Sequence, residues 1–456
     1  MHVALETGRA LACLGTLASL CATACSERPT PDPSSTASAP PAIALDDDPH
    51  AYITSAAYRR GILERDLVDP EPIYARVRLR HYSLDHARGW DRAPITDWST
   101  LPLTREQAAQ IAETKRLPRV EFGATLGAGF GTEQAPTGLP ETREAWIALG
   151  ERVFFEYPMG VAPVLGRALR DGVDLRDYGV LEGVLEHEGA YVGVRLAEHE
   201  GHTRIVTTCA SCHASRGADG VVSGIRANRE FDLARLRLEH GGAHEAQLVD
   251  ATRAEDLHKL GPGRSDVQHD DVFNPYAFPD FGGIVDMPYL HHTANWYHRG
   301  VASLAIRVET VFMTHGRASA RPPRVLMWAL AEYLRSLPPP PPVAQPSAQS
   351  ELGRQVFMAE GCDTCHTPPL YTSELRVSLD EMGTDRSAGD SPLRGTGYWR
   401  VPSLRGVGGN APYLHHGAFA TLEQMFDPAR SEPGHRYALD LQPNERAQLL
   451  AFLHTI

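Results

Sequence analysis

Cys209-Ala-Ser-Cys-His213 and Cys362-Asp-Thr-Cys-His366 share one pattern, Cys-x-x-Cys-His. This spacing is the attachment motif of a c-type haem. The two thiols add to the two vinyl groups of one porphyrin, and the histidine is held beneath the iron as its proximal ligand. The sequence therefore predicts two covalently bound haem c groups. The predicted attachment residues are Cys209, Cys212, Cys362 and Cys365, and the predicted proximal ligands are His213 and His366.

A thioredoxin-type redox pair or half of a zinc site would also use Cys-x-x-Cys. Neither alternative explains why both copies end in histidine. The chain has 7 cysteines, and the three outside the motifs are Cys13, Cys21 and Cys25. No thiol therefore remains further along the chain to complete a zinc site or to form a structural disulfide. This pattern suits an exported cytochrome better than a disulfide scaffold.

The first residues have the features of an export signal, with Arg9 followed by an apolar or small run over 10–24. Ala22-Thr-Ala-Cys25 resembles a bacterial lipoprotein cleavage box, although Ala22 stands where such boxes usually have Leu. We therefore expect Cys25 to be lipidated; the alternative is ordinary cleavage nearby, which leaves a free thiol. Ser26 then favours the outer membrane, by resemblance to such lipoproteins. The expected location is the bacterial periplasm, with a lipid anchor in the outer membrane.

Composition sets limits on the remaining classes. A formal net charge of −13 argues against non-specific nucleic-acid binding; it suits a basic partner, and solubility explains it equally well. Past the N-terminus, no apolar run is long enough to span a bilayer. At 456 residues the chain has room for two or three domains.

The two halves of the chain repeat one order of elements. Leu149-Gly-Glu-Arg-Val-Phe154 and Leu352-Gly-Arg-Gln-Val-Phe357 each predict a helix leading toward a haem motif, with Phe on the face that packs on the porphyrin. Apolar helices over 324–334 and 446–453 close the halves. We therefore predict a mainly α protein with two tandem cytochrome c-like helical domains and a helical or irregular N-terminal extension.

The predicted boundaries follow from these signals. They are a signal peptide (1–24), a Pro/Ser-rich tether (25–48), an N-terminal extension (49–145), a first haem domain with an insertion (146–337), a Pro-rich linker (338–348) and a second haem domain (349–456). Within the extension, Thr104-Arg-Glu-Gln is typical of a capped helix start.

The second half also contains Arg400-Val-Pro-Ser-Leu-Arg-Gly-Val407 and Ala411-Pro-Tyr-Leu-His-His-Gly-Ala-Phe-Ala-Thr-Leu-Glu-Gln424. With the haem motif, these segments resemble the bacterial dihaem cytochrome c peroxidase superfamily, which includes the methylamine-utilisation dihaem enzymes. The resemblance covers roughly residues 149–456. It implies an oxidoreductase or electron-transfer role, without specifying one activity.

The resemblance also suggests distal haem ligands. Where the peroxidases place Met or Tyr, this chain has Pro428-Ala429, but Gly434-His435-Arg436-Tyr437 resembles a segment of the rubber-oxygenase-like branch in which the histidine is an axial ligand. His435 is therefore the candidate distal ligand of the second haem, and the repeat makes His315 the candidate for the first. The competing candidates are Met425, Met382, His415 and His416 for the second haem, and Met159, His240, His291 and His298 for the first.

Two further features depend on the resemblance. Trp296 and Tyr297 occupy the place of the tryptophan that lies between the haems in relatives, so both are candidate electron relays; packing on haem explains them equally well. Some relatives hold calcium between the domains, and Asn410 and Pro412 fall near its ligands, but nothing in the sequence demands that ion.

The distal ligands decide between two functions. An iron with two protein ligands carries electrons, whereas an open or displaceable site binds peroxide or oxygen. The run from Thr314 to Ala320 lacks the carboxylate that the peroxidases carry near this place, which lowers the expectation of peroxidase chemistry. The favoured function is electron transfer to a redox partner protein or small electron carrier. The alternative is an enzyme that reduces hydrogen peroxide, or activates oxygen, at the first haem. A third hypothesis is a partner-binding haem module that uses the N-terminal extension.

Overall fold

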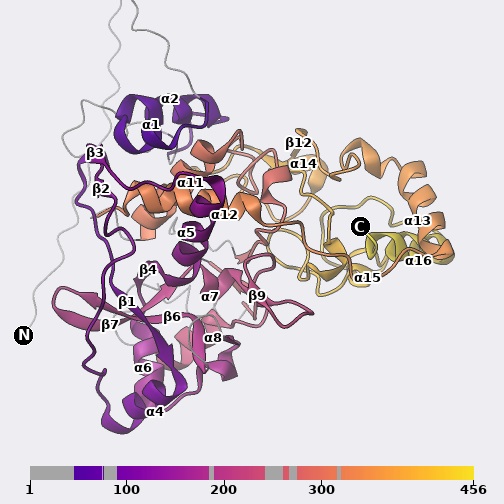
Figure 1. The fold of residues 1–456 in the computed structure, drawn as a ribbon. Helices are drawn as coiled ribbons and strands as arrows, with labels where there is room; N and C mark the ends of the chain where they lie inside the picture. Colours follow the sequence, from indigo (N-terminus) through magenta and orange to yellow (C-terminus); the bar gives the residue numbers. More distant parts are fainter. Residues whose placement is uncertain are drawn as a thin grey trace, which may run out of the picture. The chain divides into compact units, whose positions relative to one another are not determined.

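The computed structural model describes residues 46–73, 75, 90–183, 189–241, 260–266, 275–315 and 320–456. Of these, 38% are helical and 15% lie in strands or bridges (Figure 1). The expectation of a mainly helical protein is confirmed at this coarse level. The predicted signal, Cys25 and the rest of the predicted tether up to residue 45 lie outside the described residues, as does the side chain of His315.

Two N-terminal helices pack on the first haem half. α1 (Pro49–Thr54) and α2 (Ala56–Asp66) lie against α12 (Arg324–Ser336) and α11 (Val301–His315), respectively (Figure 1). Ser55 separates the two helices and caps α2, because its hydroxyl accepts a hydrogen bond from the Tyr58 amide at 3.1 Å. Part of the predicted extension is therefore integral to the first half.

A buried ionic network joins this extension to the closing helix. The guanidinium of Arg324 lies 2.6 Å from Asp91, 3.1 Å from Glu133 and 3.2 Å from Glu309. The Tyr52 hydroxyl donates to Glu309 at 2.8 Å. Burial raises the pKa of Glu309, but neighbouring arginines, Arg324 foremost, outweigh it and leave that pKa below its ordinary value. Each charge in this network therefore has an opposite charge within contact.

An antiparallel sheet lies between the extension and the first haem motif. Its strands follow the order β1 (Thr100–Thr104), β6 (Ala190–His199), β7 (His202–Thr208), β4 (Pro158–Val161), and β5 (Glu182–Gly183) pairs with β6. The description of the extension as helical or irregular is thus incomplete, since β1 supplies an edge strand. The insertion over 157–206 supplies most of the other strands. In β6, apolar and polar residues do not alternate regularly, because most residues of this strand are buried, and alternation is the usual sequence signal of a strand.

Helices flank this sheet. The expected start at Thr104 is confirmed, because Thr104 and Gln107 form a reciprocal capping box at the start of α4 (Arg105–Thr114). α4 packs on α6 (Pro163–Asp171), which packs on α8 (Leu233–His240). A core that includes Leu103, Leu169 and Leu196 fills the space between these helices and the sheet.

Each half contains one close crossing of a leading and a closing helix. α5 (Arg143–Glu156) crosses α12, and α13 (Ala348–Ala359) crosses α16 (Pro443–Leu453). Glycine permits both crossings: a Cβ on Gly150 would lie 1.9 Å from the Ala329 carbonyl oxygen, and one on Gly353 would lie 1.8 Å from that of Gln448. The repeated Leu-Gly pair therefore marks the same packing device twice.

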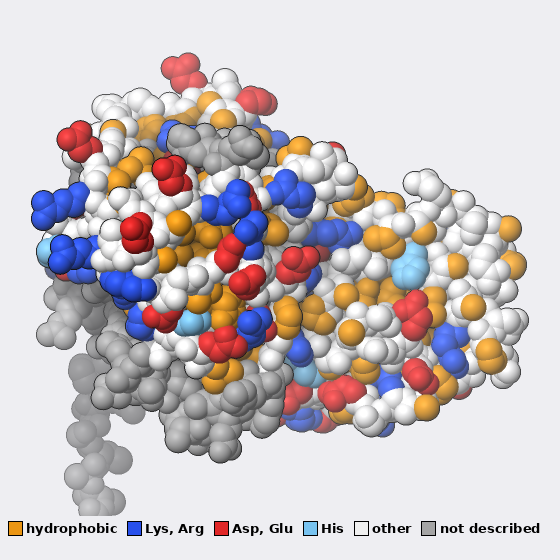
Figure 2. Space-filling model, turned by 90° about the horizontal axis from the view of Figure 1, so that it is seen from below, with side chains coloured by type: hydrophobic (Ala, Val, Ile, Leu, Met, Phe, Trp, Pro, Cys, Tyr) orange, Lys and Arg blue, Asp and Glu red, His pale blue; other side chains and the backbone are white. Residues whose placement is uncertain are grey.

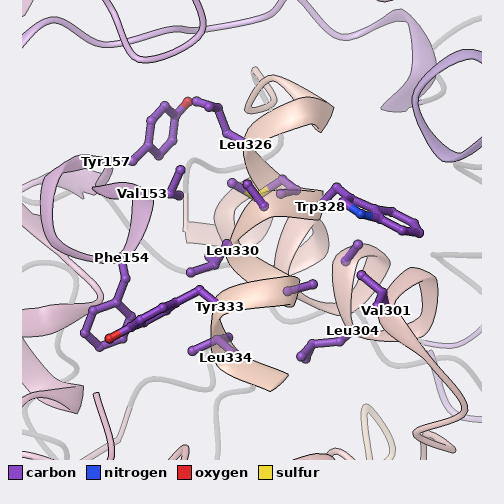
Figure 3. Packing of buried hydrophobic residues seen from close by; sticks show 14 of the residues in the cluster. Val153, Phe154, Tyr157, Val301, Leu304, Leu326, Trp328, Leu330, Tyr333 and Leu334 are labelled. Carbon is purple, nitrogen blue, oxygen red and sulfur yellow. The ribbon is translucent and has the colours of Figure 1, made fainter. Parts of the chain in front are cut away.

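Apolar side chains fill the first crossing. Figure 3 shows Val153 and Phe154 of α5 next to Leu330 and Tyr333 of α12, and Trp328 on another side of α12 near α11. Phe154 is fully buried and its ring centre lies 5.4 Å from that of Tyr333. The phenylalanine predicted to face a porphyrin thus packs in the core that borders the first haem motif.

The Pro-rich linker contacts both halves. The carbonyl of Pro341 accepts a hydrogen bond from Arg226 at 2.9 Å, and the amide of Val343 donates to the His454 carbonyl at 3.1 Å. The described part of this segment therefore lies along the protein rather than standing free as a spacer.

Short elements complete the described chain. They are η1 (Trp90–Arg92), β2 (Gly131–Thr132), β3 (Ala135–Pro136), η2 (Leu175–Tyr178), α7 (Ala210–His213), β8 (Ser215–Arg216), β9 (Val222–Ser223), β10 (Arg264–Ser265), β11 (Tyr276–Ala277), η3 (Ile284–Asp286), η4 (Cys362–Thr364), β12 (Arg376–Ser378), α14 (Leu379–Met382), β13 (Tyr398–Arg400), η5 (Val407–Gly409) and α15 (Leu422–Met425). Among the described helices, none is long and apolar enough to cross a membrane.

Candidate haem sites

The first motif forms one helical turn against the sheet. Cys209 precedes α7, and β6 crosses this turn so closely that a Cβ on Gly193 would lie 2.1 Å from the Ser211 amide nitrogen. Gly193 has φ of +72°, which a glycine adopts without strain. The sheet of the insertion thus fixes the turn that carries Cys209, Cys212 and His213.

His213 is oriented as a metal ligand would be. Its Nδ1 donates to the carbonyl of Pro279 at 3.0 Å, which leaves Nε2 as the nitrogen with a lone pair. The ring of Phe281 lies 4.4 Å from the imidazole centre. Burial lowers the pKa of His213 to about 4, so the ring stays neutral at physiological pH, as metal ligation requires.

The first pair of thiols is buried in apolar surroundings. Burial raises the pKa of Cys209 to about 12 and that of Cys212 to about 11. A buried thiol with a raised pKa is a poor redox nucleophile, which argues against a thioredoxin-type pair. Sγ of Cys209 lies 3.7 Å from the Met159 sulfur, so Met159 lies beside the attachment residue rather than across an iron from His213.

The second motif repeats the orientation of the histidine. Nδ1 of His366 lies 3.1 Å from the carbonyl oxygens of both Tyr371 and Pro402, and it donates to this pair. Burial lowers the pKa of His366, so this imidazole also stays neutral. Cys362 and Cys365 are partly exposed, and burial raises the pKa of Cys362 to about 11. The same tautomer, with Nε2 free of a proton, is therefore set in both halves.

His435 lies close to His366. The centres of the two imidazole rings are 6.5 Å apart, and their planes are inclined by 50°. Two imidazoles bound on opposite sides of one metal ion, at metal–nitrogen bonds of about 2.0 to 2.1 Å, have ring centres about 6 to 6.5 Å apart. Burial, and then the neighbouring His366, lower the pKa of His435 to about 4. Its Nδ1 is buried and has no hydrogen-bond partner among the described residues.

Most competing ligands of the second haem are engaged elsewhere. Met425 lies in one apolar core, and the Met382 side chain packs against another that includes Leu379 and Trp399. His415 stacks on Trp399 at 4.2 Å between ring centres, while Nε2 of His416 lies 3.3 Å from Glu432.

The same holds for competitors at the first haem. Both ring nitrogens of His298 are engaged, by the Met287 carbonyl at 3.1 Å and by Arg335 at 2.7 Å. Those of His240 contact Asp171 and Tyr178. Nδ1 of His291 lies 2.9 Å from the Thr293 hydroxyl. His315 is the last residue of α11, and its side chain lies outside the described part of the chain.

The two candidate relay residues differ in environment. Trp296 is buried, and its Nε1 donates to the Ser303 hydroxyl at 3.1 Å. Tyr297 is half-buried, with its ring 5.0 Å from that of Tyr289 and 4.6 Å from the Arg299 guanidinium carbon. Both belong to the segment that adjoins the second half, since the Tyr289 hydroxyl donates to the Glu374 carbonyl at 2.9 Å.

The suggested calcium position contains a cation of the chain itself. Oδ1 of Asn410 accepts a hydrogen bond from Arg229, which also lies 2.7 Å from Asp280. In the described parts of the chain, no group of three or more His, Cys, Asp or Glu side chains is arranged to hold a metal ion. The geometry at Asn410 thus gives calcium no support.

These residues fit two haem c groups. Each motif presents two thiols that are not joined in a disulfide, followed by a neutral imidazole whose Nδ1 is fixed by main-chain carbonyls. Residues of these kinds at this spacing hold haem c covalently in electron carriers and in enzymes alike. Sequence reasoning missed the residues that orient the histidines, because Phe281 and the carbonyls of Pro279 and Pro402 lie far from the motifs along the chain.

Comparisons with known proteins give structural matches alone. No family model matches, and no curated protein matches. A MauG-like protein associated with microbial copper homeostasis matches at TM-score 0.35 and 17% identity, over 70% of this chain and 90% of that one. The diheme peroxidase BthA from Burkholderia thailandensis matches at TM-score 0.28 and 17% identity, over 46% of this chain and 80% of that one. Hydrazine synthase from Kuenenia stuttgartiensis matches at TM-score 0.33 and 16% identity, over 44% of this chain and 78% of that one.

Two of these matched structures are named as a MauG-like protein and a diheme peroxidase. Because all of the TM-scores lie below 0.5, the assignment of a function to this chain depends on its own residues.

Proposed function

We propose that the protein is a dihaem c-type cytochrome that carries electrons between its two haems and a redox partner. The observation that carries this proposal is the pair of imidazoles of His366 and His435, whose ring centres lie 6.5 Å apart. Two strong protein ligands leave no position for peroxide or oxygen, and they suit an iron that changes only its oxidation state.

The residues of the second site would hold haem c and shield it from water. Cys362 and Cys365 would form the covalent links, His366 the proximal bond and His435 the distal bond. Bound haem c supplies one-electron chemistry at this place. The carbonyls of Tyr371 and Pro402 keep the His366 proton on Nδ1, and the burial of His435 excludes water from the distal side.

The first site would bind haem c through Cys209, Cys212 and His213. His315 is the proposed distal residue, on the strength of its matching place in the repeat. Trp296 and Tyr297 are the proposed relays toward the second half, supported by the hydrogen bond that joins Tyr289 to Glu374. The repeated helix crossings at Gly150 and Gly353 support two tandem cytochrome c-like domains.

Location and partner complete the proposal. The N-terminal signal and Cys25 favour a periplasmic protein with an anchor in the outer membrane. Its partner would be a redox protein or a small electron carrier. On the face in Figure 2, acidic and basic side chains are interspersed, which suits a transient encounter better than one strongly steered by a single charge.

An absorption spectrum and an electron paramagnetic resonance spectrum, recorded with and without hydrogen peroxide, test this function. A carrier should show two low-spin haems that peroxide leaves unchanged. A high-spin haem whose spectrum changes within the mixing time of peroxide would favour the peroxidase alternative at the first haem.

A further inference from the structure

Arg400 lies where the second half meets the segment 289–292 of the first. It ends β13, and its amide donates to the His292 carbonyl at 2.9 Å. Its guanidinium donates through Nη1 to the Tyr289 carbonyl at 2.7 Å. These two contacts hold the side chain at the junction of the halves.

Among the described residues, no carboxylate balances the charge of Arg400. It forms no ion pair with any carboxylate that the structure describes, and its Nε is buried without a hydrogen-bond partner. Burial lowers the pKa of Arg400 to about 10, with no carboxylate acting against it. Arg324, by contrast, contacts the three carboxylates of Asp91, Glu133 and Glu309.

The neighbours of Arg400 increase the positive potential. Burial holds the pKa values of His291 and His292 well below their ordinary value. The pKa of His291 is lowered further by the charges of Arg394, Arg307 and Arg400. The charge of Arg400 also lowers the pKa of His292. This region thus collects cationic and neutral groups. A buried charge without an opposite charge is strongly unfavourable, because it has lost its hydration without compensation. An anion is therefore the missing partner.

We infer that Arg400 binds a carboxylate, and that this carboxylate is a propionate of the second haem. The inference rests on the proposed function, since it requires haem c at Cys362 and Cys365. Pro402 supports this choice, because it lies two residues beyond Arg400 and its carbonyl accepts the Nδ1 proton of His366. One strand end would thus orient the proximal histidine and bind the porphyrin edge.

The consequence is an effect on the reduction potential. Ferric haem gains a negative charge on reduction, and a fixed positive charge beside it favours the reduced form. Removing the guanidinium should therefore lower the potential of the second haem and change the first haem less.

The test compares Arg400→Met with a matched variant, Arg376→Met. Arg376 is directly opposite Arg400 in the β12–β13 pair, but it is exposed and lies over the Tyr398 ring at 4.8 Å. Both variants lose one arginine charge. Spectroelectrochemical titration should show the reduction equilibrium of the second haem falling about tenfold in Arg400→Met, or about 59 mV for a one-electron couple. Arg376→Met should stay within error of wild type.

A haem assay is run first on each protein, so that the two proposals fail in different ways. Fewer than two haems in wild type would contradict the proposed function. Two low-spin haems with an unchanged potential in Arg400→Met would overturn the propionate inference alone.

Arg400→Lys keeps the inference testable should the methionine variant not fold. Lysine retains the charge but loses the planar two-pronged donor, so the propionate-bending band in the resonance Raman spectrum should shift while the potential changes little. An unchanged band would overturn the inference. Inorganic phosphate identifies the source of the anion: a wild-type potential that is independent of phosphate supports a propionate. If the wild-type potential depends on phosphate and Arg400→Lys removes that dependence, Arg400 binds an anion from solution, which would overturn the propionate inference.

Discussion

The imidazole of His435 lies with its ring centre 6.5 Å from that of His366, on a loop that follows α15, and the backbone of His435 is in the left-handed region, with φ of +45°. Such a conformation costs a non-glycine residue roughly 1 to 3 kcal/mol, and it persists where the surrounding structure imposes it. Arg430 donates to the carbonyl of His435 at 3.0 Å, and the backbone amide of His435 donates to the Met382 carbonyl. The backbone is thus fixed on both sides in the conformation that directs the ring inward.

Two covalent haems are the most basic expectation. A pyridine haemochrome assay and intact mass on protein matured in a competent host should give two haems per chain. His366→Ala should remove the proximal ligand of the second haem and leave the spectrum of the first largely intact. A single haem in the wild-type protein would contradict the assignment of both motifs.

Glu309→Ala should lower the free energy of unfolding by about 1.5 to 3 kcal/mol, because buried Arg324 loses one of its three carboxylate partners and keeps Asp91 and Glu133. Glu64→Ala is the matched control: Glu64 forms an exposed pair with Arg60 at 2.5 Å on α2, and its loss should cost less than about 0.5 kcal/mol. Denaturant titration of both variants measures the difference. Equal effects would contradict a stabilising role for the network between the extension and the closing helix.

Stability should fall in mild acid through buried neutral histidines such as His298. Burial, and then Arg335, lower the pKa of His298 to about 4 from an ordinary value of 6.5. Between these values the unfolded chain binds the proton and the folded one does not, so stability is complete above pH 6.5 and declines toward pH 4. Each such proton contributes at most about 1.4 kcal/mol per pH unit.

His298→Gln should therefore flatten the acid side of the unfolding free energy measured by denaturant titration across this range. His202→Gln, at the exposed start of β7, is the control and should leave the slope unchanged. Superimposable pH profiles for wild type and His298→Gln would be evidence against this titration.

The anchor proposal predicts a diacylglyceryl group on Cys25. Cys25→Ser should then move the protein from the membrane fraction to the soluble fraction, because it removes the lipidated thiol while retaining the signal and tether. Mass spectrometry of the mature N-terminus checks the modification. A wild-type protein that is already soluble and carries an unmodified thiol would contradict the anchor.

The sequence predicts local features of this fold well. The haem motifs, the capped start at Thr104 and the paired Leu-Gly helices over 149–154 and 352–357 are each defined by a few adjacent residues, so periodicity and spacing identify them. The sheet was not foreseen, because β1 pairs with β6 across a long stretch of chain and bulges interrupt the register. Pairing between distant segments has little local signal.

The candidate sites likewise contain some residues that local sequence identifies and others that only tertiary contacts define. His435 could be proposed as a ligand from the sequence because it sits in a short recognisable segment; its role as a ligand stays a prediction. The partners of the proximal histidines and the isolated charge of Arg400 depend on tertiary contacts, such as those with Tyr289 and His292. Nothing in the sequence around Arg400 marks it as lacking a carboxylate partner.

The spin state of the second haem in wild type and in His435→Ala tests the central claim most directly. Electron paramagnetic resonance, with near-infrared magnetic circular dichroism to identify the axial ligands, should show a low-spin bis-histidine haem in wild type. The alanine variant should convert that haem to high spin, because the distal imidazole is lost. A haem that stays low spin in His435→Ala, or a wild-type near-infrared band of methionine ligation, would contradict the account and transfer the ligand to Met425 or Met382.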